Sequence, residues 1–266
     1  MALSPAVMGI VNVTPDSFFP ASRTVATDEA IARGRSQFLF GADVVDVGGE
    51  STRPGATPVE ASEELARVLP VVRALALHGP VSIDTQKETV ARAAVAAGAS
   101  VLNDVSSSLY ALAGELGVGY VAMHRRGDSS TMQDRPVYDD VVGEISDFLR
   151  TVAERASGAG VEKLWLDPGI GFGKSVEHNV TLLAHVEHFV ELANEYRAGV
   201  LVGTSRKRFL AHLGRATLDV DERLEGSLAT EAWAMVQGVS MVRVHDVRET
   251  VQLRELLTRP LDAVTS

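Results

Sequence analysis

Eight short apolar runs, spread along the whole chain and separated by helix-like segments, constrain the fold of this sequence more than any other feature. Each run is rich in β-branched residues and ends in glycine or polar residues. The runs span residues 7–13, 42–48, 80–85, 99–104, 119–124, 163–169, 199–205 and 240–246. Hydrophobicity that is continuous rather than alternating predicts strands covered on both faces. We therefore expect a parallel sheet whose strands alternate with helices.

The segments between the runs have helical periodicity. In one of them, apolar side chains recur at spacings of three and four residues: Leu65, Val68, Leu69, Val72 and Leu75. Residues 175–196 are expected to form one long helix before the seventh strand. Eight such units in 266 residues predict an α/β protein, a (β/α)8 TIM barrel formed as a single domain by residues 1–266. A doubly wound open sheet is the competing arrangement.

Composition argues against several classes of partner. Lysine and arginine number 25 against 35 acidic residues, a net charge of −10, and binding to nucleic acid needs a basic face. No apolar run approaches the roughly 18 residues of a membrane-spanning helix, and the first residues lack the basic start of a signal peptide. The chain has no cysteine, which is compatible with the cytoplasm. We expect neither nucleic acid nor membrane as a partner, and a cytoplasmic location.

Polar residues gather where the predicted strands end. They are Asn12, Glu50 to Arg53, Asp84, Asn103 with Asp104, His124, Asp167, Ser205 to Lys207, and Arg243 with His245. In a parallel barrel all these ends share one rim, which is where barrel enzymes build their active sites. Each residue also has a simpler interpretation. Asp84 can cap a helix, Asn103 and Asp104 can bond their own backbone, and His124 can be a core histidine. A single ligand pocket would explain why polar residues follow all of the predicted strands.

The chemistry of these side chains suits two kinds of ligand group. Asn12, Arg53, Arg243 and His245 are donors at neighbouring strand ends and suit a phosphate or diphosphate. Asp84, Asn103, Asp167 and Lys207 offer acceptors and donors that suit the edges of a flat heterocycle. Residues 203–210 are expected to open a helix whose first N–H groups receive an anion.

Seven blocks of the sequence, in order, resemble the dihydropteroate synthase family. They are MGIVNVTPDSF at 8–18, DVGGESTRPGA at 46–56, SIDT at 82–85, ND at 103–104, DPGIGFGK at 167–174, GTSRKRFL at 203–210 and RVHDV at 243–247. The resemblance implies a (β/α)8 barrel and a transferase of folate biosynthesis. It would join 6-hydroxymethyl-7,8-dihydropterin pyrophosphate to 4-aminobenzoate and release pyrophosphate.

By matching position, the resemblance also implies residue roles. The pterin would meet Asp84, Asn103, Asp167 and Lys207. The pyrophosphate would meet Asn12, Arg53, Arg243 and His245, with Mg²⁺ at Asn12. Thr52 and Ser205 would lie near the aminobenzoate, between apolar walls formed by Pro54 and Phe172. The catalytic groups would be Asp84, Lys207, Arg243 and His245.

The resemblance further implies a homodimer, through late helices around residues 225–238, and a pocket that binds sulfonamides. One departure stands out: residues 19–23 read FPASR where the family has a glycine-containing loop. The sequence does not indicate how this changes sulfonamide affinity. Three alternatives stay open: a pterin-binding paralogue with little or no synthase activity, a barrel of the methyltetrahydrofolate methyltransferase type, and a structural or partner-binding protein.

Overall fold

Eight parallel strands close into a barrel in chain order, β1 to β8, and β1 pairs with β8 to complete the ring. The computed structural model describes residues 4–13, 20–51, 58–127, 136–214 and 217–258, and of residues 20–25 only the backbone. The closed order confirms the predicted (β/α)8 barrel. It excludes the doubly wound open sheet, because an open sheet would leave two strands without a second neighbour.

The strands lie where the apolar runs predicted them. They are β1 (Ala6–Asn12), β2 (Val44–Gly48), β3 (Val81–Asp84), β4 (Val101–Asp104), β5 (Gly119–Met123), β6 (Leu164–Asp167), β7 (Gly199–Val202) and β8 (Met241–Val244). Most are shorter than the runs, at one end or at both, and polar residues such as Asp84, Asn103 and Asp167 remain paired in the ladder at the carboxyl ends of their strands. Six side chains fill the inside of the barrel away from that rim: Met8, Val44, Val101, Val121, Leu201 and Met241.

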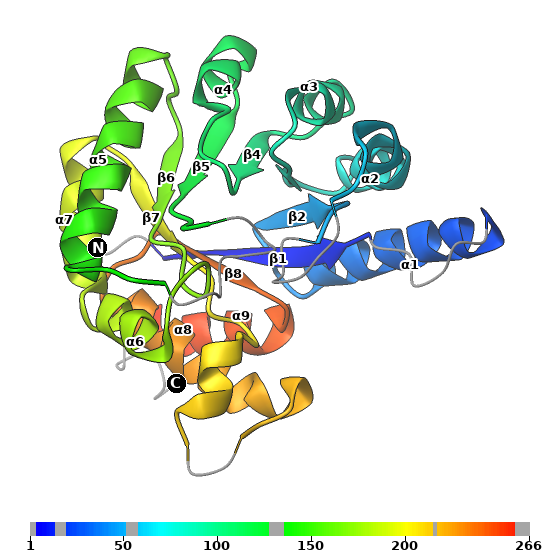
Figure 1. Cartoon of the computed structure of the whole chain (residues 1–266). Helices are drawn as coiled ribbons and strands as arrows, with labels where there is room; N and C mark the ends of the chain where they lie inside the picture. The colour runs from blue at the N-terminus through cyan, green and yellow to red at the C-terminus, as the bar shows by residue number, and fades with distance from the viewer. Residues whose placement is uncertain (1–3, 14–19, 52–57, 128–135, 215–216, 259–266) are drawn as a thin grey trace, which may run out of the picture.

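Helices surround the barrel (Figure 1). They are α1 (Pro20–Leu39), α2 (Ala61–Leu75), α3 (Glu88–Ala96), α4 (Tyr110–Leu116), α5 (Val141–Gly158), α6 (Val176–Ala184), α7 (Val186–Glu195), α8 (Leu224–Val236) and α9 (Val247–Thr258), with 3-10 helices η1 (Arg208–His212) and η2 (Val220–Arg223). The larger apolar cluster lies between the strands and these helices. The strands are therefore covered on both faces, as their continuous hydrophobicity predicted.

The prediction of one helix over 175–196 was wrong, because the segment breaks at His185 into α6 and α7. His185 has φ −112° and ψ 23°, outside the helical region, and its N–H donates to the carbonyls of Thr181 and Leu182. Both helices still bury apolar faces, with Leu182 in α6 and Phe189 in α7. The apolar spacing continues across the break, so periodicity alone does not reveal it.

Residues 20–23 also differ from the expectation of a loop. They form the first turn of α1, which begins at Pro20, a residue suited to the first helical position because its missing N–H has no intrahelical partner there. Phe19 lies outside the described residues.

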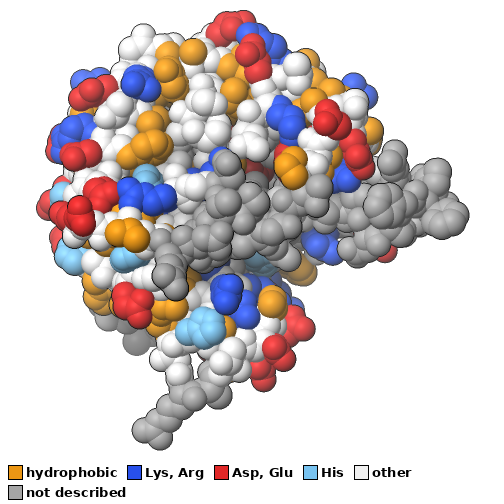
Figure 2. All heavy atoms as spheres, viewed as in Figure 1, with side chains coloured by type: hydrophobic (Ala, Val, Ile, Leu, Met, Phe, Trp, Pro, Cys, Tyr) orange, Lys and Arg blue, Asp and Glu red, His pale blue; other side chains and the backbone are white. Residues whose placement is uncertain are grey.

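The surface bears on the predicted partners. Acidic and basic side chains are interspersed on the face shown in Figure 2, and its described part has no broad basic patch. No helix within the described residues is both long and apolar enough to cross a bilayer.

Candidate functional site

Side chains from β8 and from the neighbouring strands β2, β3 and β4 form one hydrogen-bonded network around Arg243 and Asp46. Its Nε donates to Oδ2 of Asp46 on β2 at 2.7 Å, and its second terminal nitrogen donates to Oδ2 of Asp84 on β3 at 2.9 Å. Asn103 of β4 donates its amide to the same oxygen of Asp46 at 2.9 Å. We call these four residues the carboxylate cluster. It brings the predicted Asp84, Asn103 and Arg243 into one network.

Strand register explains how the carboxylate cluster forms. Gly48 pairs with Asp84, and Asp84 pairs with Asn103, so these residues lie at one level of the barrel. A Cβ atom at Gly48 would lie 3.5 Å from Cβ of Asp84 and 3.8 Å from Oδ1 of Asn12. The missing side chain of Gly48 thus leaves space beside both polar groups, within reach of the predicted Asn12.

Two carboxylate oxygens in the cluster have no hydrogen-bond partner among the residues that the structure describes. Oδ1 of Asp46 and Oδ1 of Asp84 are buried without a hydrogen bond, as is Oγ of Ser82 on the same strand as Asp84. Buried polar atoms are almost always paired, because leaving one unpaired costs about 1–3 kcal/mol. Unpaired acceptors beside one another, at the mouth of a barrel, point to a ligand with N–H or O–H donors.

A second group forms where β6 ends. Oδ1 of Asp167 accepts the N–H of Gly169 at 2.7 Å. Lys207 donates its ammonium to the carbonyl of Ile170, and its Nζ lies 4.6 Å from the centre of the Phe172 ring. The predicted Asp167, Phe172 and Lys207 therefore share one loop and its surroundings.

The glycines of this loop are required by its backbone. Gly169, Gly171 and Gly173 have φ values of 68°, 87° and 66°, in the left-handed region that favours glycine. A Cβ atom at Gly171 would also come within 2.9 Å of Cδ of Lys207. Residues 167–174 therefore form a turn that requires glycine, and this turn lies against the side chains of Asp167 and Lys207.

Burial shifts the titration of these groups toward neutral pH. Burial raises the pKa of Asp84 to about 7, against the opposing effect of Arg243. It also raises the pKa of Asp167, although the charge of Lys207 counteracts part of that shift. Burial lowers the pKa of Lys207 to about 8. Shifts of both signs in one concave region are typical of functional sites.

The predicted Ser205 and His245 are in contact. The Ser205 hydroxyl accepts the backbone N–H of His245 at 3.1 Å and lies 3.1 Å from its Nδ1. The helix expected to begin after Ser205 is absent. Arg206 has φ 56°, which an α-helix does not allow, and only the short 3-10 helix η1 follows. An anion here would meet side chains and a turn rather than the end of an α-helix.

The simpler interpretations hold for some residues. Asp104 bonds local backbone, accepting N–H groups from Ser106, Ser108 and Leu109. His124 is buried at 6% exposure beside Lys174, as expected of a core histidine. Asp84 does not cap α3, which begins four residues later. The predicted Thr52, Arg53 and Pro54 lie outside the described residues.

The sequence prediction missed two residues, Asp46 and Lys174. Asp46 is fully buried, and the available signal was a carboxylate inside an otherwise apolar run. Lys174, at the end of the 167–174 segment, is 3% exposed. Its Nζ donates to the carbonyls of Gly169 at 2.8 Å and Phe172 at 3.0 Å, so it holds the glycine loop together. A lysine in a glycine-rich turn does not by itself indicate burial.

Residues that flank 52–57 make hydrogen bonds and ion pairs with one another, with α2 and with Lys87. Glu50 accepts the N–H of Val59 at 3.3 Å and also binds the ammonium of Lys87. The same ammonium binds Glu64 of α2 at 2.5 Å. Arg67 donates to the carbonyl of Gly49 at 2.7 Å. Gly49 and Glu50, at the end of β2, are thus connected to α2 and to Lys87, which precedes α3.

The predicted Mg²⁺ has one described ligand, the amide oxygen of Asn12. The described residues contain no group of three or more His, Asp or Glu side chains able to hold a metal ion. Mg²⁺ commonly keeps several waters and binds through one or two protein oxygens plus phosphate oxygens of a substrate. A single amide oxygen beside the barrel mouth fits an ion that arrives with a diphosphate. It does not fit a permanently bound ion in a protein cage.

Comparison with known proteins gives consistent matches. The family model described as "Pterin binding enzyme" matches residues 8–245. Dihydropteroate synthase of Escherichia coli K12 is 42% identical over 267 residues, covering 97% of this chain and 93% of that protein. The Yersinia pestis dihydropteroate synthase, solved with a sulfonamide drug complex, has a TM-score of 0.87 at 39% identity, covering 97% of this chain and 94% of that chain. The Xanthomonas albilineans dihydropteroate synthase, solved with 4-aminobenzoic acid, has a TM-score of 0.86 at 43% identity, covering 97% and 95%.

Proposed function

This chain belongs to the family of pterin-binding enzymes, and on that premise we propose that it catalyses the dihydropteroate synthase reaction. The reaction joins 6-hydroxymethyl-7,8-dihydropterin pyrophosphate to 4-aminobenzoate and yields 7,8-dihydropteroate and pyrophosphate. The carboxylate cluster carries the proposal, because its buried oxygens without a partner need donors that the described part of the chain does not supply. A pterin ring carries ring and exocyclic N–H groups of that kind.

The pterin would be held from two sides. Asp84 and Asn103 would meet one edge of the ring, and Asp167 would accept N–H groups from another. Lys207 would donate to the ring carbonyl, and its ammonium stays close to the face of Phe172. In this arrangement the carboxylates are buried, which strengthens their interaction with a positively charged ring.

The carbon–oxygen bond between the pterin methylene and the diphosphate breaks, and the diphosphate leaves with the bonding electron pair. Arg243 and His245, with Arg53, would stabilise the charge that develops on the leaving oxygen. A Mg²⁺ ion bound to the diphosphate and Asn12 would supply further charge neutralisation. Arg243 also binds Asp46 and Asp84, so one guanidinium links the ring-binding carboxylates to the leaving group.

Positive charge on the methylene is delocalised into the ring, where the anions of Asp84 and Asp167 stabilise it. The aniline nitrogen of 4-aminobenzoate then attacks the methylene carbon and releases one proton to solvent. This nitrogen is nucleophilic without losing a proton first, so no strong general base is needed. That requirement fits a site whose described groups include no Ser–His pair backed by a carboxylate.

The aminobenzoate would lie beside Ser205, with Phe172 as one apolar wall and the predicted Thr52 and Pro54 nearby. The Xanthomonas albilineans relative was solved with 4-aminobenzoic acid and the Yersinia pestis relative with a sulfonamide drug complex. We infer that the same pocket of this chain accepts sulfonamides, which share the aniline ring of aminobenzoate.

Purified protein with both substrates, with and without Mg²⁺, tests the proposal. The expected result is dihydropteroate and pyrophosphate in equal amounts, dependent on both substrates and stimulated by Mg²⁺. Pterin binding without product would identify a silent paralogue. Methyl transfer from methyltetrahydrofolate without pyrophosphate release would identify a methyltransferase. Absence of pterin binding would leave a structural or partner-binding role.

We also infer a homodimer that uses α8. On this helix Trp233 is 49% exposed and Val236 is 67% exposed, so two large apolar side chains are available to a partner. Sedimentation analysis should show a dimer that the Trp233→Glu variant weakens, and a monomeric wild-type protein would contradict this. The cytoplasmic location stays a prediction from composition.

A further inference from the structure

The segment after β7 turns sharply at Arg206, between two residues assigned to the site. The N–H of Lys207 donates to the carbonyl of Thr204 at 3.1 Å and closes a four-residue turn. Arg206 occupies the third position of the turn with φ 56°, a conformation that non-glycine residues adopt uncommonly. Ser205 and Lys207 are therefore held on either side of a residue whose backbone is unfavourable unless other contacts fix it.

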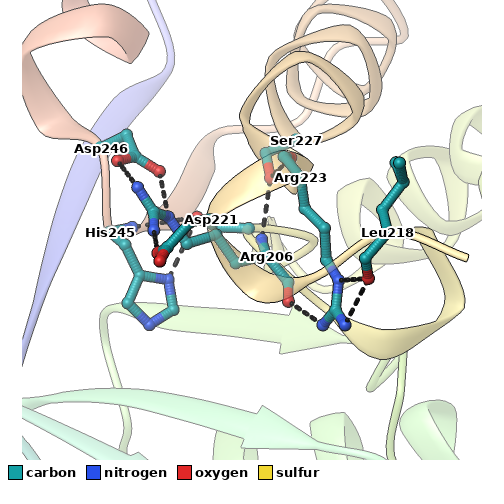
Figure 3. Close-up of polar contacts among 8 residues, drawn as sticks. Arg206, Leu218, Asp221, Arg223, Ser227, His245 and Asp246 are labelled. Carbon is teal, nitrogen blue, oxygen red and sulfur yellow. Dashed lines mark hydrogen bonds and ion pairs between the residues drawn. The ribbon is translucent and has the colours of Figure 1, made fainter. Parts of the chain in front are cut away.

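Arg206 has many such contacts, shown in Figure 3. Its Nε and one terminal nitrogen donate to the two oxygens of Asp246 at 2.9 and 2.6 Å, which is a bidentate ion pair. Its other terminal nitrogen donates to Asp221 at 3.2 Å. Its backbone N–H donates to the hydroxyl of Ser227 on α8 at 2.8 Å, and its carbonyl accepts from Arg223 at 3.1 Å.

The bidentate pair joins two strand ends. Asp246 follows His245 directly, after β8, whereas Arg206 lies between Ser205 and Lys207, after β7. In Figure 3 the imidazole of His245 points away from the carboxylate of Asp246, so the ion pair and the imidazole are on opposite sides of this segment. Arg206 and Asp246 are 26% and 16% exposed, so the pair is largely shielded from solvent.

We propose that Arg206 and Asp246 are positioning residues for the reaction: their ion pair holds the turn that carries Ser205 and Lys207 against the segment that carries His245. This inference rests on the proposed function. Neither side chain needs to touch substrate. A guanidinium that binds both carboxylate oxygens fixes orientation as well as distance. It thereby sets the contact between Ser205 and His245, where the aminobenzoate and diphosphate would adjoin.

Five variants test the pair: Arg206→Asn, Arg206→Lys, Asp246→Asn, the double variant Arg206→Asn with Asp246→Asn, and Asp221→Asn. Asparagine tolerates the left-handed backbone at 206 and keeps the shape of aspartate at 246. Asp221 binds the same guanidinium but is 97% exposed, so Asp221→Asn is the matched control. The measurements are kcat, the KM of each substrate, pyrophosphate binding by calorimetry, and thermal unfolding.

Each single variant at the pair should lower kcat/KM and weaken pyrophosphate binding, with a loss of roughly 10- to 100-fold as expected for misplaced groups. The double variant should lose no more than the worse single variant, because the two residues act as one unit. Arg206→Lys should recover only part of the activity, since lysine keeps the charge but not the two parallel bonds. Asp221→Asn should stay within about twofold of wild type, as expected of an exposed ion pair.

Two results would overturn the inference: wild-type kinetics and pyrophosphate binding in Arg206→Asn, or fully additive losses in the double variant. A lower unfolding temperature with unchanged kinetics would also overturn it, because the pair would then only stabilise the fold. If Arg206→Asn does not fold, Asp246→Asn decides alone. Failure of the proposed function is distinguishable from failure of this inference, since in the first case the wild-type protein itself would form no product.

Discussion

At the residue scale, the central feature is a carboxylate whose charge is held in a buried position by one arginine. Asp84 is 8% exposed, and one of its oxygens binds Arg243 while the other has no partner within the described segments of the chain. If this anion stabilises the pterin cation, its charge matters more in the transition state than in the bound substrate.

Asp84→Asn should therefore lower kcat by about 100-fold, the size typical of losing one electrostatic contact in a transition state. The dissociation constant of the pterin pyrophosphate should rise by less than about tenfold, because the asparagine oxygen still accepts a hydrogen bond. Asp43→Asn is the matched control. Asp43 comes just before β2, the strand of Asp46, so it lies at the opposite end of the barrel. There it binds Arg254 and not the site. Equal losses in kcat and in binding would mean that Asp84 only positions the substrate.

The pH profile of kcat/KM should be a narrow bell. Asp84 must be ionised and has a pKa raised to about 7, whereas Lys207 must be protonated and has a pKa lowered to about 8. The rate constant should fall about tenfold per pH unit below the first value and above the second. In the Asp84→Asn variant, kcat/KM should no longer fall as the pH is lowered below about 7. A flat profile in the wild-type enzyme between about pH 5.5 and 9.5 would contradict this assignment.

At the element scale, one buried lysine holds the loop after β6. Burial lowers the pKa of Lys174 to about 7, and its Nζ donates to the carbonyls of Gly169 and Phe172. Between this pH and the ordinary pKa of 10.5 the unfolded chain binds more protons than the folded one, so stability rises with pH across that window.

Lys174→Met should remove that rise and lower the free energy of unfolding at pH 7 by about 2–3 kcal/mol, because it leaves buried carbonyls unpaired. Denaturant unfolding at several pH values measures both effects. Lys163→Met is the control, since Lys163 is exposed just before the same strand. A variant as stable as wild type, with the same pH dependence, would show that Lys174 does not hold the loop.

The packing of α8 against α9 contains a buried acid. Burial raises the pKa of Glu231 to about 8, and Thr250 donates a hydrogen bond to it at 2.8 Å. Between about pH 4.5 and 8, Glu231 is protonated in the folded protein but ionised in the unfolded chain. The stability of the folded protein therefore falls as pH rises across this range.

Glu231→Gln should abolish that fall and make the protein more stable than wild type at pH 9, by at least about 1 kcal/mol. Thermal unfolding across pH 5–9 measures the difference, with the exposed Glu225→Gln as control. The prediction fails if the difference between variant and wild type does not grow with pH.

The elements also show what the sequence could predict. Strands and their polar ends were predictable, because a parallel strand buried on both faces leaves a continuous apolar run and ends at a common rim. The break at His185 and the turn at Arg206 were not. The turn at Arg206 is stabilised by tertiary contacts, such as the hydroxyl of Ser227, that local sequence does not contain, whereas the break at His185 interrupts an apolar spacing that continues through it. Asp46 was missed because its partners, Asn103 and Arg243, are distant along the chain. Lys174 was missed because the sequence does not indicate its burial.

At the scale of the whole molecule, barrel closure makes the site. β8 pairs with β1, which lies next to β2, so Arg243 reaches Asp46 although 197 residues separate them. The same closure places Asn12 of β1 beside Asp84 of β3 across Gly48. Groups that are widely spaced in the sequence thus surround one mouth, where a ring and its leaving group can be bound together.

The structure of the protein bound to 6-hydroxymethyl-7,8-dihydropterin pyrophosphate tests this account most directly. The account predicts that N–H groups of the ring bind Oδ1 of Asp84 and the carboxylate of Asp167, and that the diphosphate lies against Arg243 and His245. A pterin bound outside the barrel mouth, with the buried oxygens of Asp46 and Asp84 still unpaired, would contradict it.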